Sequence, residues 1–458
     1  DDNPRGENPK IIRDQIKKGI KKNINLIEIP NRKIAINKSI DDLCSGEITI
    51  VAGKGHEKTQ EYRDGKKYFS DRDEILNSIM IKNKKLFNDL RLNIIQEKTK
   101  LISKSLKLNN ISINSKELKK NDIFFAIKGK KIDGSKFLSE AIKKKSSLLI
   151  THKLNKNISL SKQIKVKETL NFLSECAKTY RNNINTKIIG ITGSCGKTSL
   201  KELLGESLSN ITKTYFSPKS YNNKFGVPLS LLNLKQNKNF GIFEVGMDKK
   251  GEINSLTKIL KPNLGIITNI SYAHSKNFKS INGIAEAKSE ILNNIMNGGS
   301  IILNKDDKFY NYLKVKAIKK NLKIFSFSVK NKNSYSNLDK VVRIGKKFKI
   351  LLKVNSKKYF YYSNFNSQNY IQNLLAAITT ISLFFDLRNI SKNIFLNFKT
   401  PVGRGDFSKL KFKNKIINFI DESYNSNPLS LKNALNNFSK MKIKKNAKHV
   451  LLGDMLEL

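Results

Sequence analysis

The sequence predicts an α/β protein of several domains, built around a mostly parallel sheet that binds phosphate groups. Beyond residue 186, short apolar runs typical of buried strands alternate with longer helical stretches. A glycine-rich segment joins the first of these runs to the helical stretch that follows it. The length of 458 residues leaves room for about three domains of ordinary size.

The chain before residue 186 is expected to hold two smaller α/β pieces. In the first piece, an apolar run at residues 48–52 is predicted to be a strand that leads into a glycine-rich loop. Residues 82–105 are rich in lysine, lack the glycine and proline residues that mark turns, and are interpreted as a connector. The second piece starts near residue 106, with a predicted strand at 122–127 and a predicted helix at 136–145.

The remaining elements follow the same logic of apolar runs and turn residues. Four runs are predicted to form the parallel sheet, at residues 187–192, 241–245, 264–270 and 300–303. Later elements are predicted as antiparallel strands in 341–362, a buried helix at 371–385, a strand at 416–420, a helix from Pro428 and a strand-like run at 449–452. We interpret both ends of the chain as cuts through larger domains.

The net charge of +49 raises the alternative of a nucleic-acid-binding protein, because basic surfaces attract phosphate backbones. The lysines, however, are scattered through every segment together with asparagine and isoleucine, as an AT-rich coding bias would produce. Aromatic residues also do not interleave with the basic runs, as a platform for stacking bases requires. We therefore expect no specific nucleic-acid partner.

The location predicted from composition is the bacterial cytoplasm. The three cysteines show no pairing or metal-ligand spacing, which suits a reducing compartment, and the four histidines do not cluster. No apolar run reaches the roughly eighteen residues of a membrane-spanning helix, and no signal-peptide pattern opens the chain. Membrane insertion is therefore not expected.

The most specific local signal is the segment from Gly190 to Thr198, Gly-Ile-Thr-Gly-Ser-Cys-Gly-Lys-Thr. Its glycines let successive backbone N–H groups turn toward phosphate oxygens at the start of a helix. Lys197 is predicted to reach the β- and γ-phosphates, and the Thr198 hydroxyl to bind Mg²⁺. The nucleotide-binding candidates are Gly193, Ser194, Cys195, Gly196, Lys197, Thr198 and Ser199.

Further motifs follow this loop in a fixed order. They are Asn222-Asn223, Glu244-Val245-Gly246-Met247, Gly251-Glu252-Ile253, Thr268-Asn269-Ile270, Ala273-His274, Ala287-Lys288-x-Glu290, Gly403-Arg404, Asp421-x-Ser423-Tyr424-Asn425-x-Asn427-Pro428 and Gly453-Asp454-Met455-x-Glu457-Leu458. This series, from about residue 106 to 458, resembles the Mur ligase family. The resemblance is strongest to the branch that adds D-alanyl-D-alanine to UDP-N-acetylmuramoyl-tripeptide.

The resemblance implies a multidomain architecture and a reaction. Residues 106–185 would form an N-terminal UDP-substrate domain, 186–398 a central ATP-binding domain with a parallel sheet, and 399–458 a partial Rossmann-like C-terminal domain. ATP and Mg²⁺ would be the cofactors, and UDP-N-acetylmuramoyl-tripeptide and D-alanyl-D-alanine the substrates. The reaction would form an amide through an acyl phosphate, as a step of bacterial cell-wall synthesis.

The same resemblance assigns roles to single residues. Lys197, His274 and Lys288 would be catalytic, and Thr198, Glu244, His274 and Lys288 would hold Mg²⁺. In relatives the lysine equivalent to Lys288 is carbamylated, which turns a cation into an anion. The candidates for ATP contact are Asn269, Arg404, Asp421, Tyr424 and Asn425, although Asn425 and Asn427 could instead cap the helix after them. Ser115 and Lys116 lie where the family holds the UDP-sugar, and Asn114, Lys116 and Ser135 depart from its pattern.

The front of the chain resembles a different enzyme of this family. Asp2, Asn3, Pro4 and Arg5, then Gly53 and Glu57, and later Asp71-Arg72 resemble the last domain of the ligase that adds meso-diaminopimelate. Arg5 would take the carboxylate of that amino acid and Glu57 its ammonium group. Residues 1–82 would then be part of a Rossmann-like domain, joined by a linker at 83–105, in a fusion of consecutive pathway enzymes. No diaminopimelate ligation is expected from this piece.

Two alternative functions stay open at this point. One is another amide ligase of the same superfamily, such as a folylpolyglutamate synthetase. The other is a basic phosphate-loop protein that binds nucleic acid.

Overall fold

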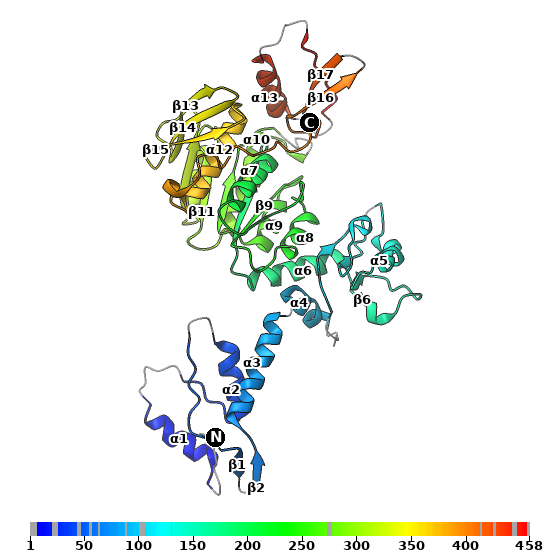
Figure 1. The fold of residues 1–458 in the computed structure, drawn as a ribbon, viewed down its shortest axis with the longest axis vertical. Coiled ribbons are helices and arrows are strands. Elements are labelled where there is room, and N and C mark those ends of the chain that lie inside the picture. Colours follow the sequence, from blue (N-terminus) through cyan, green and yellow to red (C-terminus); the bar gives the residue numbers. More distant parts are fainter. Residues whose placement is uncertain are drawn as a thin grey trace. The chain divides into compact units, whose positions relative to one another are not determined.

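The computed structural model describes residues 7–20, 26–43, 47–54, 57–62, 65–87, 89–99, 106–129, 131–272, 277–412, 415–424, 427–441 and 447–455. The chain divides into two compact units, Asp1–Lys104 and Ser105–Leu458. Figure 1 shows the elements of both units in chain order. Within the described residues, none of the helices has the length and apolar character needed to cross a bilayer.

The first unit consists of helices and one short hairpin. Its elements are α1 (Pro9–Lys18), α2 (Arg32–Asp42), β1 (Thr59–Tyr62), β2 (Gly65–Tyr68), α3 (Asp71–Phe87) and α4 (Leu90–Thr99). Strands β1 and β2 pair in antiparallel fashion. Arg32 ties α2 to the start of α3, because its Nε donates to Asp71 Oδ1 at 2.8 Å and its Nη2 donates to the carbonyl of Ala52, also at 2.8 Å. The lysine-rich connector stretch is largely helical where it is described.

One strand expected in this unit is wrong. Residues 48–52 have no strand partner among the described residues, and the side chains of Ile48 and Ile50 are exposed. An apolar run becomes a strand only where a neighbour satisfies its backbone N–H and C=O groups. The local pattern of apolar residues does not indicate whether such a neighbouring strand exists.

The second unit begins with a small parallel sheet. Its strands β3 (Ile111–Ser112), β4 (Ile123–Phe125), β5 (Leu148–Thr151) and β6 (Gln163–Lys165) pair in sequence order, and α5 (Leu138–Lys143) and α6 (Thr169–Asn182) follow β4 and β6. Phe124, Leu138 and Leu149 are the buried centre of its core. The helix expected at 136–145 is shorter, because a 3-10 turn at Gly134–Phe137, capped by Asp133, precedes it.

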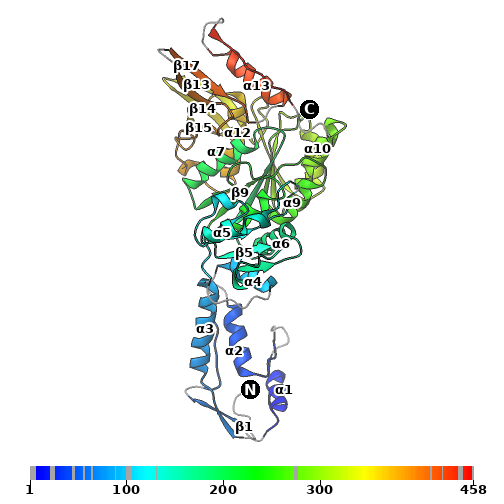
Figure 2. The ribbon, with the colours of Figure 1, turned by 90° about the vertical axis from the view of Figure 1, so that its right-hand side faces the viewer.

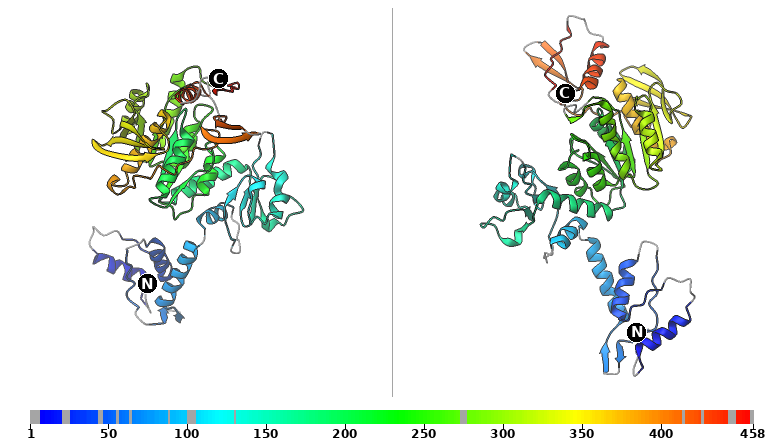
Figure 3. Two further views of the ribbon diagram at one scale, coloured as in Figure 1. Left: turned by 45° about the horizontal axis from the view of Figure 1, so that its top comes forward. Right: turned by 180° about the vertical axis from the view of Figure 1, so that it is seen from behind.

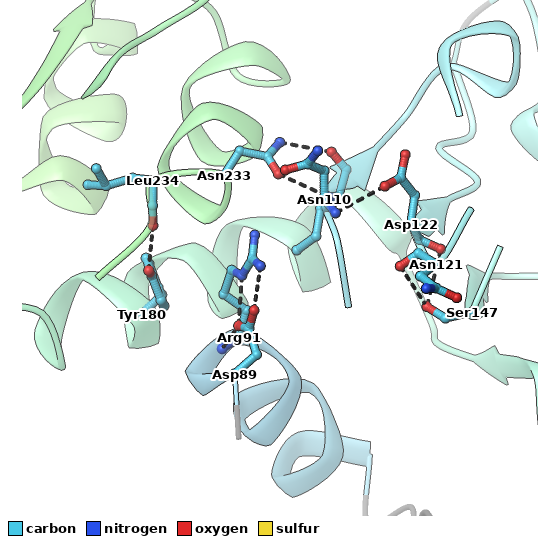
Figure 4. A network of polar contacts seen from close by, with 10 residues as sticks. Asp89, Arg91, Asn110, Asn121, Asp122, Ser147, Tyr180, Asn233 and Leu234 are labelled. Atoms are coloured by element: carbon cyan, nitrogen blue, oxygen red, sulfur yellow. Dashed lines mark hydrogen bonds and ion pairs between the residues drawn. The ribbon is translucent and has the colours of Figure 1, made fainter. Parts of the chain in front are cut away.

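The side chain of Asn233 helps to join this small sheet to the body that follows it. Asn233 Oδ1 accepts from the backbone N–H of Ile111 at 2.9 Å, and Asn233 Nδ2 donates to the Ile111 carbonyl at 2.8 Å (Figure 4). Beside it, the hydroxyl of Tyr180 on α6 donates to the carbonyl of Leu234. A carboxamide carries one acceptor and a donor group, so Asn233 completes the hydrogen bonding at the edge strand β3.

The central body is a nine-stranded sheet. Its strands are β7 (Lys187–Thr192), β8 (Thr214–Phe216), β9 (Phe240–Glu244), β10 (Leu264–Ile267), β11 (Ser300–Asn304), β12 (Lys323–Ser328), β13 (Ser336–Ile344), β14 (Lys347–Val354) and β15 (Lys357–Ser363). The order is β15-β14-β13-β12-β11-β10-β7-β9-β8, parallel from β8 to β13 and antiparallel between β13, β14 and β15. The predicted parallel sheet and the antiparallel ribbon are confirmed, although the strand expected at 264–270 ends at Ile267.

Helices cover both faces of this sheet. On one face α7 (Lys197–Ser209) packs against α12 (Gln368–Ser382), while α9 (Glu252–Leu260) and α10 (Ile281–Ser289) lie on the opposite face (Figure 2). The two remaining helices of the body are α8 (Gly226–Leu232) and α11 (Tyr310–Ile318). A large core lies between the sheet and the α7–α12 pair, and the buried helix predicted at 371–385 is confirmed as α12.

The last part of the chain forms a hairpin and a helix. Strands β16 (Asp406–Phe412) and β17 (Lys415–Asp421) pair in antiparallel fashion, and α13 (Pro428–Ser439) begins at the predicted proline (Figure 3). Asn427 caps α13 in a capping box with Ser430. The strand expected at 449–452 is wrong, because these residues have no strand partner among the described residues and the side chain of Leu451 is fully exposed.

Candidate active site

The phosphate loop lies at the carboxyl end of β7, between its neighbours β9 and β10. In an open parallel sheet this edge is where ligands bind. Gly193 has φ +147° and Gly196, the N-cap residue of α7, has φ +82°. Left-handed backbone at these two positions turns the loop so that it opens α7. The first turn of α7 contributes Lys197, Thr198 and the half-buried Ser199.

Two residues that directly follow the neighbouring strand β10 brace this loop. Asn269 Oδ1 accepts from the N–H of Cys195 at 2.9 Å, and the Asn269 carbonyl accepts from the N–H of Ser194 at 2.9 Å. The hydroxyl of Thr268 donates to the Cys195 carbonyl at 2.6 Å. Asn269 thus holds the loop in shape, and its contact with a nucleotide stays a prediction.

Replacing Gly193 with alanine is expected to disrupt the loop. A Cβ at this position would lie 1.9 Å from Thr268 Oγ1, and its φ is one that side chains rarely adopt. We expect an affinity for Mg-ADP at least about tenfold lower, equivalent to about 1.4 kcal/mol, measured by titration calorimetry. Gly298→Ala is the matched control, since Gly298 also has positive φ, +73°, but no atom within 4 Å of the added Cβ. Equal binding by the Gly193→Ala variant and the wild type would contradict the expectation.

A buried acid stands at the end of β9, beside the loop. Glu244 Oε2 accepts from the Thr198 hydroxyl at 2.7 Å, and Glu244 Oε1 accepts from Asn222 Nδ2 at 2.8 Å. The side chain of Glu244 is 1% exposed, and among the described residues no cationic side chain pairs with it. Ser220 adds a further oxygen, with its Oγ 3.3 Å from Thr198 Oγ1. The structure therefore gathers two hydroxyl groups beside a buried carboxyl group.

Lys197 folds back over the phosphate loop. Its Nζ donates to the carbonyl of Gly193 at 2.8 Å and lies 3.4 Å from the carbonyl of Ser194. The ammonium group therefore stays at the loop that the sequence assigns to phosphate.

Lys288 is buried at the end of α10, and its side chain is 1% exposed. Burial lowers the pKa of its ammonium group well below the ordinary value of 10.5, and the charge of Lys197 adds to this effect. Among the described residues, no hydrogen bond or ion pair holds its amine. Two residues on, Glu290 accepts from the N–H groups of Gly251 and Asn254 at 2.6 and 3.0 Å, and so caps α9.

The last part of the chain brings Arg404 to the same edge. Its Nη2 lies 3.5 Å from the hydroxyl of Ser220, and its guanidinium group stacks on the ring of Tyr424 at 4.2 Å. Asp421, at the end of β17, accepts from the N–H of Ser423 at 2.9 Å, and hydrogen bonds from the side chain and then the backbone of Ser423 lower the pKa of its carboxyl group. The structure thus places Arg404 beside Ser220 and Thr198, with Tyr424 supporting it.

Asn427 acts as the cap that the sequence left open as an alternative. It also contacts the phosphate loop, because its Nδ2 donates to Cys195 Sγ at 3.0 Å. Asn425 lies outside the described residues. So do His274 and the four front residues Asp2, Asn3, Pro4 and Arg5.

The remaining predicted site residues belong to the small sheet and to the first unit. Ser115 is buried and donates to Glu140 Oε2 at 2.8 Å, while Lys116 is exposed; both follow β3 in the small sheet. In the first unit, Gly53 has φ +108° and Glu57 is exposed. These positions keep their assignments as predictions.

Comparison with known proteins places the chain in a family. Sequence models described as "Mur ligase middle domain" and "Mur ligase family, catalytic domain" match residues 191–381 and 107–181. A protein of Rickettsia prowazekii named UDP-N-acetylmuramoyl-tripeptide–D-alanyl-D-alanine ligase is 32% identical over 360 residues, which are 78% of each chain. The chain belongs to the Mur ligase family.

Other members of the Mur ligase family show the same similarity. A protein of the same name from Buchnera aphidicola subsp. Acyrthosiphon pisum is 34% identical over 78% of this chain and 77% of its own length. A crystal structure of MurF from Acinetobacter baumannii matches with a TM-score of 0.66 and 27% identity over 76% of each chain. MurF from Thermotoga maritima, solved in complex with ADP, has a TM-score of 0.62 at 22% identity over 74% of this chain and 76% of its own, and supports the fold alone.

Two residues of this Mur ligase site had no role in the sequence prediction. Ser220 lies within hydrogen-bond reach of both Thr198 and Arg404, and Asn222 was recognised only as part of a motif. A serine in a loop carries no distinctive signal. The Asn222-Asn223 pair before a buried helix was the signal that could have directed attention to this loop.

Proposed function

We propose that the chain is an ATP-dependent ligase that joins UDP-N-acetylmuramoyl-tripeptide to D-alanyl-D-alanine in the synthesis of the peptidoglycan precursor. The observation that carries the proposal is the buried Thr198–Glu244 pair beside the phosphate loop, in a chain of the Mur ligase family. Three relatives that are 32 to 34% identical over more than three quarters of this chain carry the name of this ligase.

The chemistry begins with an unreactive carboxylate. ATP transfers its γ-phosphoryl group to a carboxylate oxygen of the tripeptide, which forms an acyl phosphate and releases ADP. The amine of D-alanyl-D-alanine then attacks the acyl carbon, and the tetrahedral intermediate expels phosphate as the amide forms. Both steps build negative charge, so the site needs positive groups that are fixed in advance.

The chain's own groups fit this need. Backbone N–H groups of the loop and the N-terminus of α7 would hold the phosphates, and Lys197 would neutralise the charge on the transferred group. Arg404 would add a bidentate contact to phosphate oxygens from the last part of the chain, since it lies beside Ser220. Four further residues are proposed to contact ATP directly or to hold the residues that do: Asn269, Asp421, Tyr424 and Asn425.

The donor atoms present fit Mg²⁺. Oxygen ligands from the Thr198 hydroxyl and the Glu244 carboxylate suit a hard divalent cation, and the carboxylate is buried without a cationic partner among the described residues. When bound there, Mg²⁺ would offset the charge of the triphosphate. His274 is proposed as a further ligand.

Lys288 is proposed to carry a carbamate. Its buried amine has a lowered pKa and is therefore neutral more readily than an ordinary lysine, and only a neutral amine attacks CO₂. The nitrogen bonds to the carbon of CO₂ while one C=O π bond opens, and the nitrogen then loses a proton, which leaves one negative charge shared by two oxygens. These oxygens would complete the Mg²⁺ site.

Domain assignments are part of the same proposal. Residues 106–185 would bind the UDP-linked substrate, through Ser115 and Lys116 among others, 186–398 would bind ATP, and 399–458 would belong to the C-terminal domain. Residues 1–82 would be part of a diaminopimelate-adding ligase, joined through 83–105. The support for this fusion is the ordered set of motif residues, together with the positive φ of Gly53 and the Arg32–Asp71 ion pair that fixes the motif residue Asp71.

The test is phosphate release from ATP by the whole chain. With UDP-N-acetylmuramoyl-tripeptide present, we expect release that depends on D-alanyl-D-alanine and on Mg²⁺. Adding meso-diaminopimelate in place of the dipeptide should give none. Tight binding to random DNA at physiological salt, modulated by ATP and without any phosphate release, would instead favour a basic nucleic-acid-binding protein.

A further inference from the structure

The loop that connects β8 to α8 forms one wall of the metal and phosphate site. We call residues 217–223 the crossover loop. Ser220 lies 3.3 Å from the Thr198 hydroxyl, and Asn222 Nδ2 donates to Glu244 at 2.8 Å. The carbonyl of Asn222 also accepts from the N–H of Gly246 at 2.8 Å. The position of this loop therefore determines how Ser220 contacts Thr198 and how Asn222 contacts Glu244.

The buried side chain of Lys201 contacts the backbone of the crossover loop. Lys201 follows Lys197 by one turn of α7, and its side chain is fully buried. Its Nζ donates to the carbonyl of Ser217 at 2.5 Å and to the carbonyl of Lys219. Glu202 Oε1 lies 2.8 Å from the same Nζ and balances its charge. Burying a charged group costs free energy unless it is paired and hydrogen-bonded, and here it is both.

The backbone of the loop needs such support. Lys219 has φ +50°, a left-handed conformation that is unfavourable for a residue with a side chain. Such conformations persist where surrounding contacts fix them, and Lys201 contacts the carbonyl of this same residue. The left-handed turn at Lys219 directly precedes Ser220.

We infer that Lys201 is a positioning residue for the proposed metal and phosphate site. Its ammonium group fixes the crossover loop, and the loop in turn fixes Ser220 and Asn222 against Thr198 and Glu244. The inference rests on the proposed ATP-dependent function. A lysine suits this task because its compact ammonium group offers three donors, whereas methionine fills similar space and offers none.

The test compares Lys201→Met with the wild type in two measurements on the whole chain. Amide hydrogen exchange, followed by mass spectrometry, should become at least about tenfold faster in the crossover loop and unchanged in α12, since lost local support lowers the opening free energy. The Mg²⁺ concentration that half-saturates ADP binding, measured by calorimetry, should rise by about tenfold, as when a supporting partner of a metal ligand is lost.

Two matched variants of α7 separate this role from general stability. Glu202→Gln removes the ion pair but keeps both carbonyl contacts, so it should lower the melting temperature, while both measurements should change less than in Lys201→Met. Leu208→Ala removes apolar contacts from the same helix, so it should lower the melting temperature without shifting the Mg²⁺ dependence. A Leu208→Ala shift as large as that of Lys201→Met would overturn the inference.

The remaining outcomes also decide the matter. Should Lys201→Met fail to fold, Lys201→Gln retains one amide donor group and should give intermediate values of both readouts. Wild-type Mg²⁺ dependence and loop exchange in either folded variant would overturn the positioning role, while the proposed function stands. If the wild type itself binds no Mg-ADP, that result contradicts the proposed ATP-dependent function, and the inference about Lys201 that rests on it falls as well.

Discussion

Replacing Lys288 with alanine is expected to abolish ligation, with a loss of at least about a thousandfold in kcat, the upper range for removing one group that stabilises developing charge. The proposed carbamate oxygens would be lost, and with them part of the Mg²⁺ site. A short carboxylic acid, such as acetate, should partly restore activity, because its carboxylate can place one negative charge, shared by two oxygens, in the space that the side chain leaves. The measurement is phosphate release by the variant across a series of acetate concentrations.

The control for this variant is Lys288→Met, which fills the space and should not be rescued. Undiminished activity of Lys288→Ala would remove Lys288 from the mechanism. The same residue gives a pH signature, because its folded-state pKa lies well below the ordinary 10.5. Between these two values the unfolded chain binds more protons than the folded one, so the free energy of unfolding rises with pH up to about 10.5. In CO₂-free buffer this rise should be present in the wild type and weaker in Lys288→Met.

Replacing Lys197 with methionine should lower kcat by about a hundredfold to a thousandfold, the usual range for losing one preorganised donor to developing charge. Lys197 lies over the phosphate loop, 2.8 Å from the Gly193 carbonyl, so its ammonium group is in place before the reaction. Arginine should not restore activity, because its planar fork replaces a compact charge. Steady-state phosphate release measures the effect.

Lys258→Met is the matched control for that variant, since Lys258 is exposed on α9 and has no proposed role. Its kcat should stay within error of the wild type. A Lys197→Met enzyme with more than half of the wild-type kcat would contradict the assignment of Lys197 to the transferred phosphoryl group.

Local signals predicted the phosphate loop and the strands around it. A strand, a glycine-rich turn and a helix start are encoded within about fifteen residues, so Gly193, Lys197 and Thr198 could be placed without tertiary information. Where a partner decides the structure, the sequence was less informative. Residues 48–52 and 449–452 have strand-like composition, yet no neighbouring strand pairs with them in the described chain.

The sequence did not reveal the parts of the site that form when residues distant in the chain come together in the fold. Asn269 was expected at ATP, and the structure shows its amide engaged with the backbone of Cys195. Ser220 lies in the crossover loop, which Lys201 and Thr198 contact from α7. A lysine within the buried stripe of Leu200, Leu203 and Leu204 was the one signal of a buried cation.

The attachment of the small sheet through Asn233 has an evolutionary consequence. The side chain binds only main-chain atoms of Ile111, so any residue other than proline at that position keeps both bonds. Position 233, by contrast, tolerates little: aspartate lacks the donor, and glutamine adds a methylene to the reach. Strand β3 of the region that receives the UDP-linked substrate in our proposal can therefore diversify in sequence while the Asn233 amide keeps its contact with the main chain.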